Sequence, residues 1–237
     1  MKKIGLLISA LLITMNINAN TMIDSLKTYI KNQELDKILR LLQENPEVLD
    51  QQDETGTSGL LMIAYSGMPS VFETAKSLKK TFSFHEAIVC GKMEQVKELL
   101  KDGSNGIDEY SSDGFTPVSL AAFFDQTEIS TWLLEQGADP NLHATNASKV
   151  NALHAAVAKG NVELCKSLIQ KGADVNAPQM QQVTALHSAA HRGNLELMQL
   201  LVQNGADVSL KMENGDTALS IAQRDGHKEV AAYLSSL

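Results

Sequence analysis

The sequence predicts an all-α repeat solenoid, a fold in which short helical units stack in a row. Four short segments read almost alike, and their starts are 35, 33 and 33 residues apart. Self-similarity at a fixed period of this size is typical of a repeat array rather than of a fold with one central core. The segments are Thr116-Pro117-Val118-Ser119, Asn151-Ala152-Leu153-His154, Thr184-Ala185-Leu186-His187 and Thr217-Ala218-Leu219-Ser220.

The fullest copy of the unit spans residues 183–208 and predicts two helices. Ala189 and Ala190 would let the two helices approach closely, and the leucines after them form an apolar stripe at helical spacing. Gly193 ends the first helix and Gly205 the second, because glycine adopts the left-handed conformation at little cost. One unit cannot bury its own apolar face, so neighbouring units must stack.

This unit resembles the ankyrin repeat, which combines T-P-L-H, paired alanines, a glycine before the second helix and a closing G-A-D-V. The resemblance implies stacked helix-turn-helix units with short β-hairpin fingers. It also implies that His154 and His187 tie neighbouring repeats together by hydrogen bonds, and His85 matches the same slot. Thr184 and Thr217 take structural positions in this motif. The aspartates of the G-A-D motif are expected to cap the finger turns: Asp139, Asp174 and Asp207.

The repeat array is expected to fill residues 20–237, with clear units in the second half and degenerate ones in the first. Only 24 residues separate Leu60 from Phe84, so the unit between them should lack its finger. The degenerate units are 24–55, 56–81 and 82–113, the clear units are 114–148, 149–181 and 182–214, and the C-terminal cap is 215–237.

Residues 1–19 are predicted to be a cleavable signal peptide. Lys2 and Lys3 precede an apolar stretch of about a dozen residues, whereas a bilayer-spanning helix needs about 20. We expect cleavage after Ala19 and a periplasmic or secreted protein, with no stable membrane span once it is mature. The dilysine start and compact apolar stretch indicate a bacterial protein. An uncleaved membrane anchor, with the repeats outside the cytosol, is the alternative.

The composition favours a soluble solenoid that binds a protein. Hydrophobic residues make up 43% and aromatic residues 5% of the chain, and the formal net charge is −8. Loss of Lys2 and Lys3 would take this charge to −10, so phosphate backbones would repel the mature protein. A nucleic-acid partner is therefore not expected. A basic partner is favoured, although an acidic surface also serves solubility, and we expect a monomer when unbound.

Neither a metal site nor a cofactor site is predicted. Cys90 and Cys165 lie in units separated by a repeat, about 20 Å apart, which is too far for a disulfide. Cys165 should be a small buried hydrophobe, whereas Cys90, just before a turn glycine, should lie nearer the open face. His187 and His191 are four residues apart on one helix, but the structural role of His187 argues against metal binding.

No enzymatic activity is expected. The chain lacks G-x-S-x-G, H-E-x-x-H, a P-loop and any cysteine–histidine pair in a catalytic motif. Nearly every residue belongs to a repeat, which leaves no separate domain for a reaction.

A concave binding face is expected from the residues that precede each turn glycine or its substitute. The resemblance places such residues beside the finger tips. Asp125 replaces the turn glycine of one unit, and Phe123 and Phe124 precede it. Two adjacent aromatic residues on a helix cannot both point into the same core, so at least one is expected to be exposed as a binding anchor. Phe124→Ala is predicted to weaken partner binding without unfolding the array. The predicted concave residues are Tyr65, Val89, Phe123, Phe124, Lys159, His191, Arg192 and Arg224.

The fingers form the second predicted binding surface. The finger after Asp139 carries two extra residues relative to the regular spacing, and solenoid insertions often map to the binding face. The predicted finger contacts are His143, Asn146, Lys149, Met180 and Lys211.

Three functions fit an exported repeat array of this kind. The first is a periplasmic inhibitor that occludes a partner, such as an immunity protein against a secreted toxin. The second is a periplasmic helper of an oxidative-stress enzyme such as catalase, and the third is a host-directed ankyrin effector. The acidic composition fits an inhibitor of a basic target, and the sequence does not decide among the three.

Overall fold

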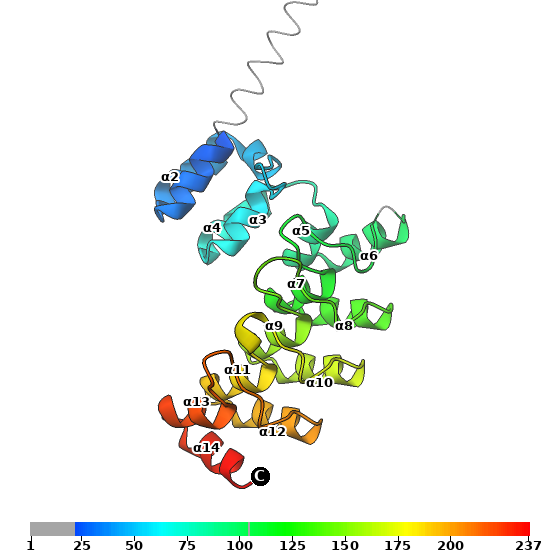
Figure 1. The fold of residues 1–237 in the computed structure, drawn as a ribbon. Helices are drawn as coiled ribbons and strands as arrows, with labels where there is room; N and C mark the ends of the chain where they lie inside the picture. Colours follow the sequence, from blue (N-terminus) through cyan, green and yellow to red (C-terminus); the bar gives the residue numbers. More distant parts are fainter. Residues whose placement is uncertain (1–21, 104) are drawn as a thin grey trace, which may run out of the picture. The chain divides into compact units, whose positions relative to one another are not determined.

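A computed structural model of the chain describes residues 22–103 and 105–237, and helices dominate this part of the molecule (Figure 1). The predicted all-α repeat solenoid is confirmed. The expected β-hairpin fingers are wrong for the described residues, which form no strand and only one isolated bridge, Gln52 to Ser58. The predicted signal peptide, residues 1–19, lies outside the described residues.

The chain divides into two compact units, Met1–Glu86 and Ala87–Leu237. In the first unit, helical residues 22–31 are followed by α2, α3 and α4, which pack around a short 3₁₀ turn, and then by α5. Gly59 lies so close to this turn that a Cβ there would be 2.2 Å from the Val48 carbonyl oxygen. The elements are α2 (Leu35–Glu44), η1 (Pro46–Leu49), α3 (Gly59–Tyr65), α4 (Pro69–Leu78) and α5 (Phe84–Val89), the last ending in the second unit.

A buried ion pair replaces the missing finger between α4 and α5. The Lys79 ammonium contacts Glu86 Oε1 at 3.1 Å and Asp50 Oδ1 at 2.6 Å, and it donates to the Leu49 carbonyl at 3.1 Å. The Ser58 hydroxyl donates to the same Glu86 oxygen, Oε1, at 2.5 Å. Lys79 therefore satisfies buried acceptors beside the short connection between α4 and α5.

Glu86, not His85, occupies the histidine slot of this repeat. The Ser83 backbone N–H donates to Glu86 Oε2 at 2.9 Å, and the Glu86 N–H lies 3.4 Å from Ser83 Oγ. This reciprocal pair is a capping box, S-x-x-E, so the placement of His85 in that slot is wrong.

The second unit consists of helix pairs that stack in chain order (Figure 1). The first helices of successive pairs pack on one another, α7 on α9, α9 on α11 and α11 on α13. The second helices form a parallel row in the same order. The helices are α6 (Met93–Lys101), α7 (Pro117–Phe123), α8 (Thr127–Glu135), α9 (Ala152–Lys159), α10 (Val162–Gln170), α11 (Ala185–Arg192), α12 (Leu195–Gln203), α13 (Ala218–Arg224) and α14 (Lys228–Ser235), with η2 (Met180–Gln182) in a finger.

Histidine side chains link two of the first helices, α9 and α11, to the finger that follows each. In His154, Nδ1 accepts from the Asn151 backbone N–H at 3.4 Å, and Nε2 lies 3.0 Å from the Ala177 carbonyl. His187 repeats this arrangement with the Thr184 N–H at 3.1 Å and the Leu210 carbonyl at 3.1 Å. Because Nδ1 accepts, the proton must sit on Nε2 and both imidazoles are neutral.

The first helices end in a left-handed residue. Gly160 and Gly193 have φ of 75° and 65°, and Asp125 adopts φ of 58° at the equivalent turn. Aspartate tolerates this region better than most residues because its short side chain can hydrogen-bond locally. Here Asp125 Oδ1 accepts from Asn161 Nδ2 of the next unit at 2.9 Å.

Asparagine side chains connect the bases of successive fingers. Asn141 accepts from the Asp174 backbone N–H at 2.8 Å and donates to the Gly172 carbonyl at 2.9 Å. Asn176 makes the same two bonds to the next finger, with the Asp207 N–H and the Gly205 carbonyl. The G-A-D aspartates bond within their own turns, each accepting from the backbone N–H two residues later.

Both cysteines are buried. Cys165 is fully covered, and burial raises the pKa of its thiol to about 12. Cys90 is only 5% exposed, so the expectation that it lies nearer the open face is wrong. The Gln126 amide lies over this turn and donates to the Val89 carbonyl at 3.4 Å.

Candidate binding face

Most of the predicted concave residues in the second unit are exposed on the first helices. Phe123, Lys159, His191, Arg192 and Arg224 are exposed, each at or near the end of its helix. Phe124 is half-buried. In the first unit, Tyr65 is half-buried at the end of α3.

The prediction that Val89 belongs to the concave face is wrong. Val89 is completely buried, so it offers a partner no surface. It is the last residue of α5, and its apolar side chain turns into the core instead of toward the open side.

An aromatic cluster forms the α7 end of the face. The Phe123 side chain is 39% exposed, its ring stacks on Phe115 at 6.4 Å between centroids, and the edge of Phe124 meets it at 5.2 Å. Lys159 Nζ, from the next first helix, lies 5.1 Å from the centre of the Phe123 ring. The exposed ring is therefore held in place by three neighbours, and a rigid aromatic of this kind suits a binding anchor.

A pocket of about 310 Å³ lies further along the same face. Three first helices and a finger contribute to it, so the pocket exists only because successive repeats stack on one another. Aliphatic side chains form much of its wall, and charged side chains surround its mouth. The lining residues are Ala158 of α9, Val183, His187, Ser188, His191 and Arg192 at or in α11, Met212 of the finger, and Ile221 and Arg224 of α13.

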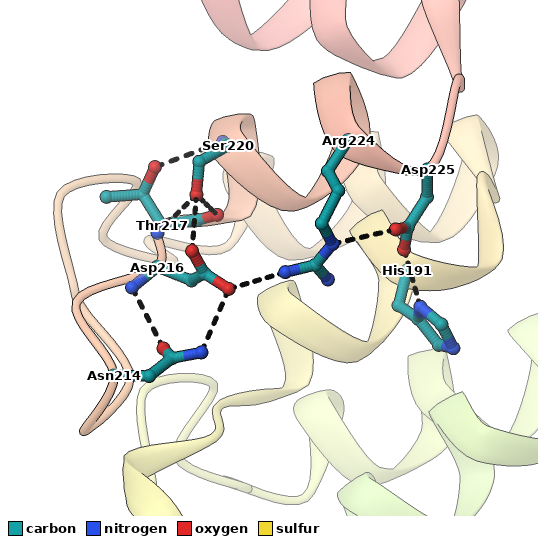
Figure 2. Close-up of polar contacts among 7 residues, drawn as sticks. All are labelled: His191, Asn214, Asp216, Thr217, Ser220, Arg224 and Asp225. Carbon is teal, nitrogen blue, oxygen red and sulfur yellow. Dashed lines mark hydrogen bonds and ion pairs between the residues drawn. The ribbon is translucent and has the colours of Figure 1, made fainter.

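A chain of polar contacts fixes the charged side of the pocket (Figure 2). Arg224 donates from Nη1 to Asp216 at 2.6 Å and from Nε to Asp225 at 3.0 Å. His191 Nδ1 lies 2.6 Å from the other oxygen of Asp225. Asn214 Nδ2 donates to Asp216 at 3.0 Å, which brings the finger into the same network.

These contacts keep both carboxyl groups ionised. The His191 hydrogen bond, followed by that of Arg224, lowers the pKa of Asp225. The Arg224 and Asn214 hydrogen bonds lower the pKa of Asp216. The result is a preformed, charged edge beside an apolar pocket.

The fingers present fewer free side chains than predicted. Lys149, Met180 and Lys211 are exposed, with Met180 at 50%, whereas His143 and Asn146 are half-buried. Asn146 donates to the Asp113 carbonyl at 2.8 Å and accepts from the Ser148 N–H at 3.0 Å. The Asn146 side chain thus fixes its own finger and links it to the segment around Asp113, before the preceding first helix.

Several pocket residues were absent from the sequence prediction. Ser188 lies four residues before Arg192 and so shares its side of the helix, a spacing that could have identified it. Met212 and Ile221 depend on how the last finger folds over α13, for which the sequence carries no local signal.

The described residues offer neither a cluster of metal ligands nor a membrane-spanning helix. Within 22–103 and 105–237, His, Cys, Asp and Glu form no group of three that could hold a metal ion. His187 and His191 do not converge, because both nitrogens of His187 face backbone groups of its own repeat array. No helix in the described part of the chain is long and apolar enough to cross a bilayer.

Comparison with known proteins places the chain in a family. The family profile described as "Ankyrin repeats (3 copies)" matches residues 26–144, 84–179 and 153–237. The human DNA-binding protein RFXANK is 38% identical over 64 residues, which cover 27% of this chain and 25% of that protein. The rat ankyrin repeat and SAM domain-containing protein 6 is 33% identical over 103 residues, 44% of this chain and 11% of the relative.

A yeast protein gives a longer match. The Saccharomyces cerevisiae target of rapamycin complex 2 subunit AVO2 is 26% identical over 147 residues, 57% of this chain and 34% of that protein. The chain therefore spans about a third or less of each of these relatives. The family profile, in contrast, extends over most of the sequence and coincides with the stacked helix pairs, so this chain belongs to the ankyrin repeat family.

Proposed function

We propose that this protein is a non-enzymatic binding module that holds a protein partner on the concave face of its second unit. Ankyrin repeat proteins generally mediate protein–protein interactions. The observation that carries the proposal is a row of exposed side chains on successive first helices, beside a pocket that several repeats of the second unit build together. Phe123 at one end and Arg192 near the other mark the extent of this surface.

In its most concrete form, the proposed module is an inhibitor that occludes a secreted toxin, as an immunity protein does. The charged and apolar start of the sequence supports export to the periplasm or beyond. Occlusion needs only a rigid surface, and the packed aromatic cluster and the charged edge of the pocket supply one. A catalase helper and a host-directed effector use the same surface and differ in the partner's identity.

The test is capture of the partner from native extract with matched variants. Tagged full-length protein is produced in its own cells and the bound proteins are identified by mass spectrometry. Phe123→Ala removes an aromatic that is 39% exposed, and Leu35→Ala removes an apolar residue in the first unit that is 40% exposed. We expect one partner to be lost with Phe123→Ala and retained with Leu35→Ala.

The identity of that partner separates the three forms of the proposal: a toxin, an oxidative-stress enzyme or a host protein. Circular dichroism of both variants must show native helix content. A partner that Phe123→Ala retains as well as the wild type would contradict the placement of the binding face. Phe124 is the less exposed of the two aromatics, so it serves here as support for Phe123.

A further inference from the structure

We infer that the pocket beside His191 receives an acidic peptide segment of the protein partner, with one apolar side chain inside the pocket and carboxylates at its mouth. The inference rests on the proposed function, since it names the chemistry of the partner that the concave face would hold. It is carried by the size of the pocket, its aliphatic wall and the arrangement of charge around it.

The size and wall of the pocket suit one or two side chains. Its volume is about 310 Å³, at the lower end of ligand pockets, which commonly measure about 300–1,000 Å³. Ala158, Val183 and Ile221 supply aliphatic surface from three different repeats. An apolar side chain placed there would bury surface against all three at once.

Unpaired cations lie at the mouth of this pocket and along the same face. The exposed guanidinium of Arg192 forms no ion pair with any residue that the structure describes. Lys159 contacts the Phe123 ring and likewise has no carboxylate partner among residues 22–103 and 105–237. Both cations are therefore available to a bound carboxylate.

The acidic groups at the mouth do not cancel these cations, because they are already engaged. Asp225 accepts from Arg224 and His191, and Asp216 accepts from Arg224 and Asn214 (Figure 2). The second terminal nitrogen of Arg224 makes no hydrogen bond to the described residues and remains as a further donor. A guanidinium suits a carboxylate well because its N–H groups can form two parallel hydrogen bonds.

This local charge runs against the charge of the whole chain. The formal net charge is −8, which alone favours a basic partner, yet the mouth of the pocket exposes the unpaired guanidinium of Arg192. Complementary charge at a binding site sets specificity and register more than total affinity. An acidic segment is therefore selected at this site even though the rest of the surface repels it.

The inference is tested with a random dodecapeptide library displayed on phage and selected on immobilised full-length protein. Wild-type protein is expected to enrich peptides in which aspartate or glutamate flanks a single leucine, isoleucine, methionine or phenylalanine. Arg192→Glu should reduce binding of the synthetic consensus peptide at least fivefold. Lys171→Glu makes the same change of charge at an exposed position outside the pocket and should leave binding unchanged.

A second variant tests the pocket without changing charge. Ala158→Trp places a large side chain at the exposed mouth and should also abolish peptide binding, with native circular dichroism in each variant. A basic consensus, a consensus without acidic residues, no enrichment, or equal binding by Arg192→Glu would overturn the inference. If the inference fails but Phe123→Ala still abolishes capture of the partner, the proposed function stands. If Phe123→Ala also leaves capture unchanged, both the proposed binding face and the inference are refuted.

Discussion

The buried imidazole of His154 predicts a specific loss of stability in mild acid. Burial, together with the charge of His143 nearby, lowers the pKa of His154 to about 4, from a usual value of 6.5. Protonation would also place a hydrogen on Nδ1, which already accepts from the Asn151 N–H. The folded protein therefore resists taking up a proton that the unfolded chain binds readily.

The sign and size of the effect follow from proton linkage. As the pH falls below 6.5, the unfolded chain gains a proton at this residue and the folded chain does not until about pH 4, so unfolding becomes more favourable. A difference of about 2.5 pKa units corresponds to about 3.4 kcal/mol when complete, and to about 2 kcal/mol at pH 5. The contribution of neutral His154 to the free energy of unfolding is fully present above pH 6.5, the pKa of this histidine in the unfolded chain, and is lost as the pH falls toward 4.

The assay compares wild type with His154→Gln, whose amide can donate to the Ala177 carbonyl but cannot titrate. Urea unfolding at pH 7 and pH 5 should show that the wild type loses about 2 kcal/mol more than the variant. His143→Gln, at a half-buried finger residue, is the control and should keep most of the pH dependence. NMR titration of the His154 ring should show a midpoint near 4. Equal pH dependence in wild type and His154→Gln, or a midpoint near 6.5, would refute this reasoning.

Two further predictions concern polar contacts that hold the units together. Glu86→Gln should destabilise the first unit by about 3 kcal/mol in thermal unfolding, because it leaves the buried Lys79 ammonium without its buried partner. The double variant with Lys79→Met should recover much of this loss, and a double variant no more stable than the single one would contradict the mechanism. Asn176→Ala should cost about 1–2 kcal/mol and speed hydrogen exchange at the Asp207 amide, because both of its bonds to the next finger disappear. Unchanged exchange at Asp207 would show that this contact does not hold the fingers together.

Local chemistry made the helical units predictable from the sequence. Thr116, Asn151 and Thr217 each stand immediately before a first helix, where the side-chain oxygen accepts from a free backbone N–H group. The β-hairpin fingers, in contrast, were predicted but do not form in the part of the chain that the structure describes. Neighbouring fingers share isolated backbone bonds, such as Met180 N–H to the Ser148 carbonyl at 3.0 Å, and a single bond does not make a ladder.

The candidate site was predictable only in part. Alignment of the repeats shows where a residue lies along its helix, but it does not show whether its side chain is exposed or buried. Alignment located Phe123 and Arg192 on the first helices, where they are exposed. It failed for Val89, since the same position at the end of the short α5 points an apolar side chain inward. The pocket is lined by residues about 30 apart in the sequence, such as Ser188 and Ile221, and the alignment of single repeats does not reveal that they lie near one another.

The asparagine bridges between fingers make each joint independent of the surface on which recognition takes place. Asn141 and Asn176 bind backbone atoms only, one N–H and one carbonyl of the next finger. Any unit with the same turn can supply those two atoms, whatever its exposed side chains are. Mutations that retune the concave face for a new target can therefore accumulate without loosening the joints, and whole units can be exchanged as interchangeable modules.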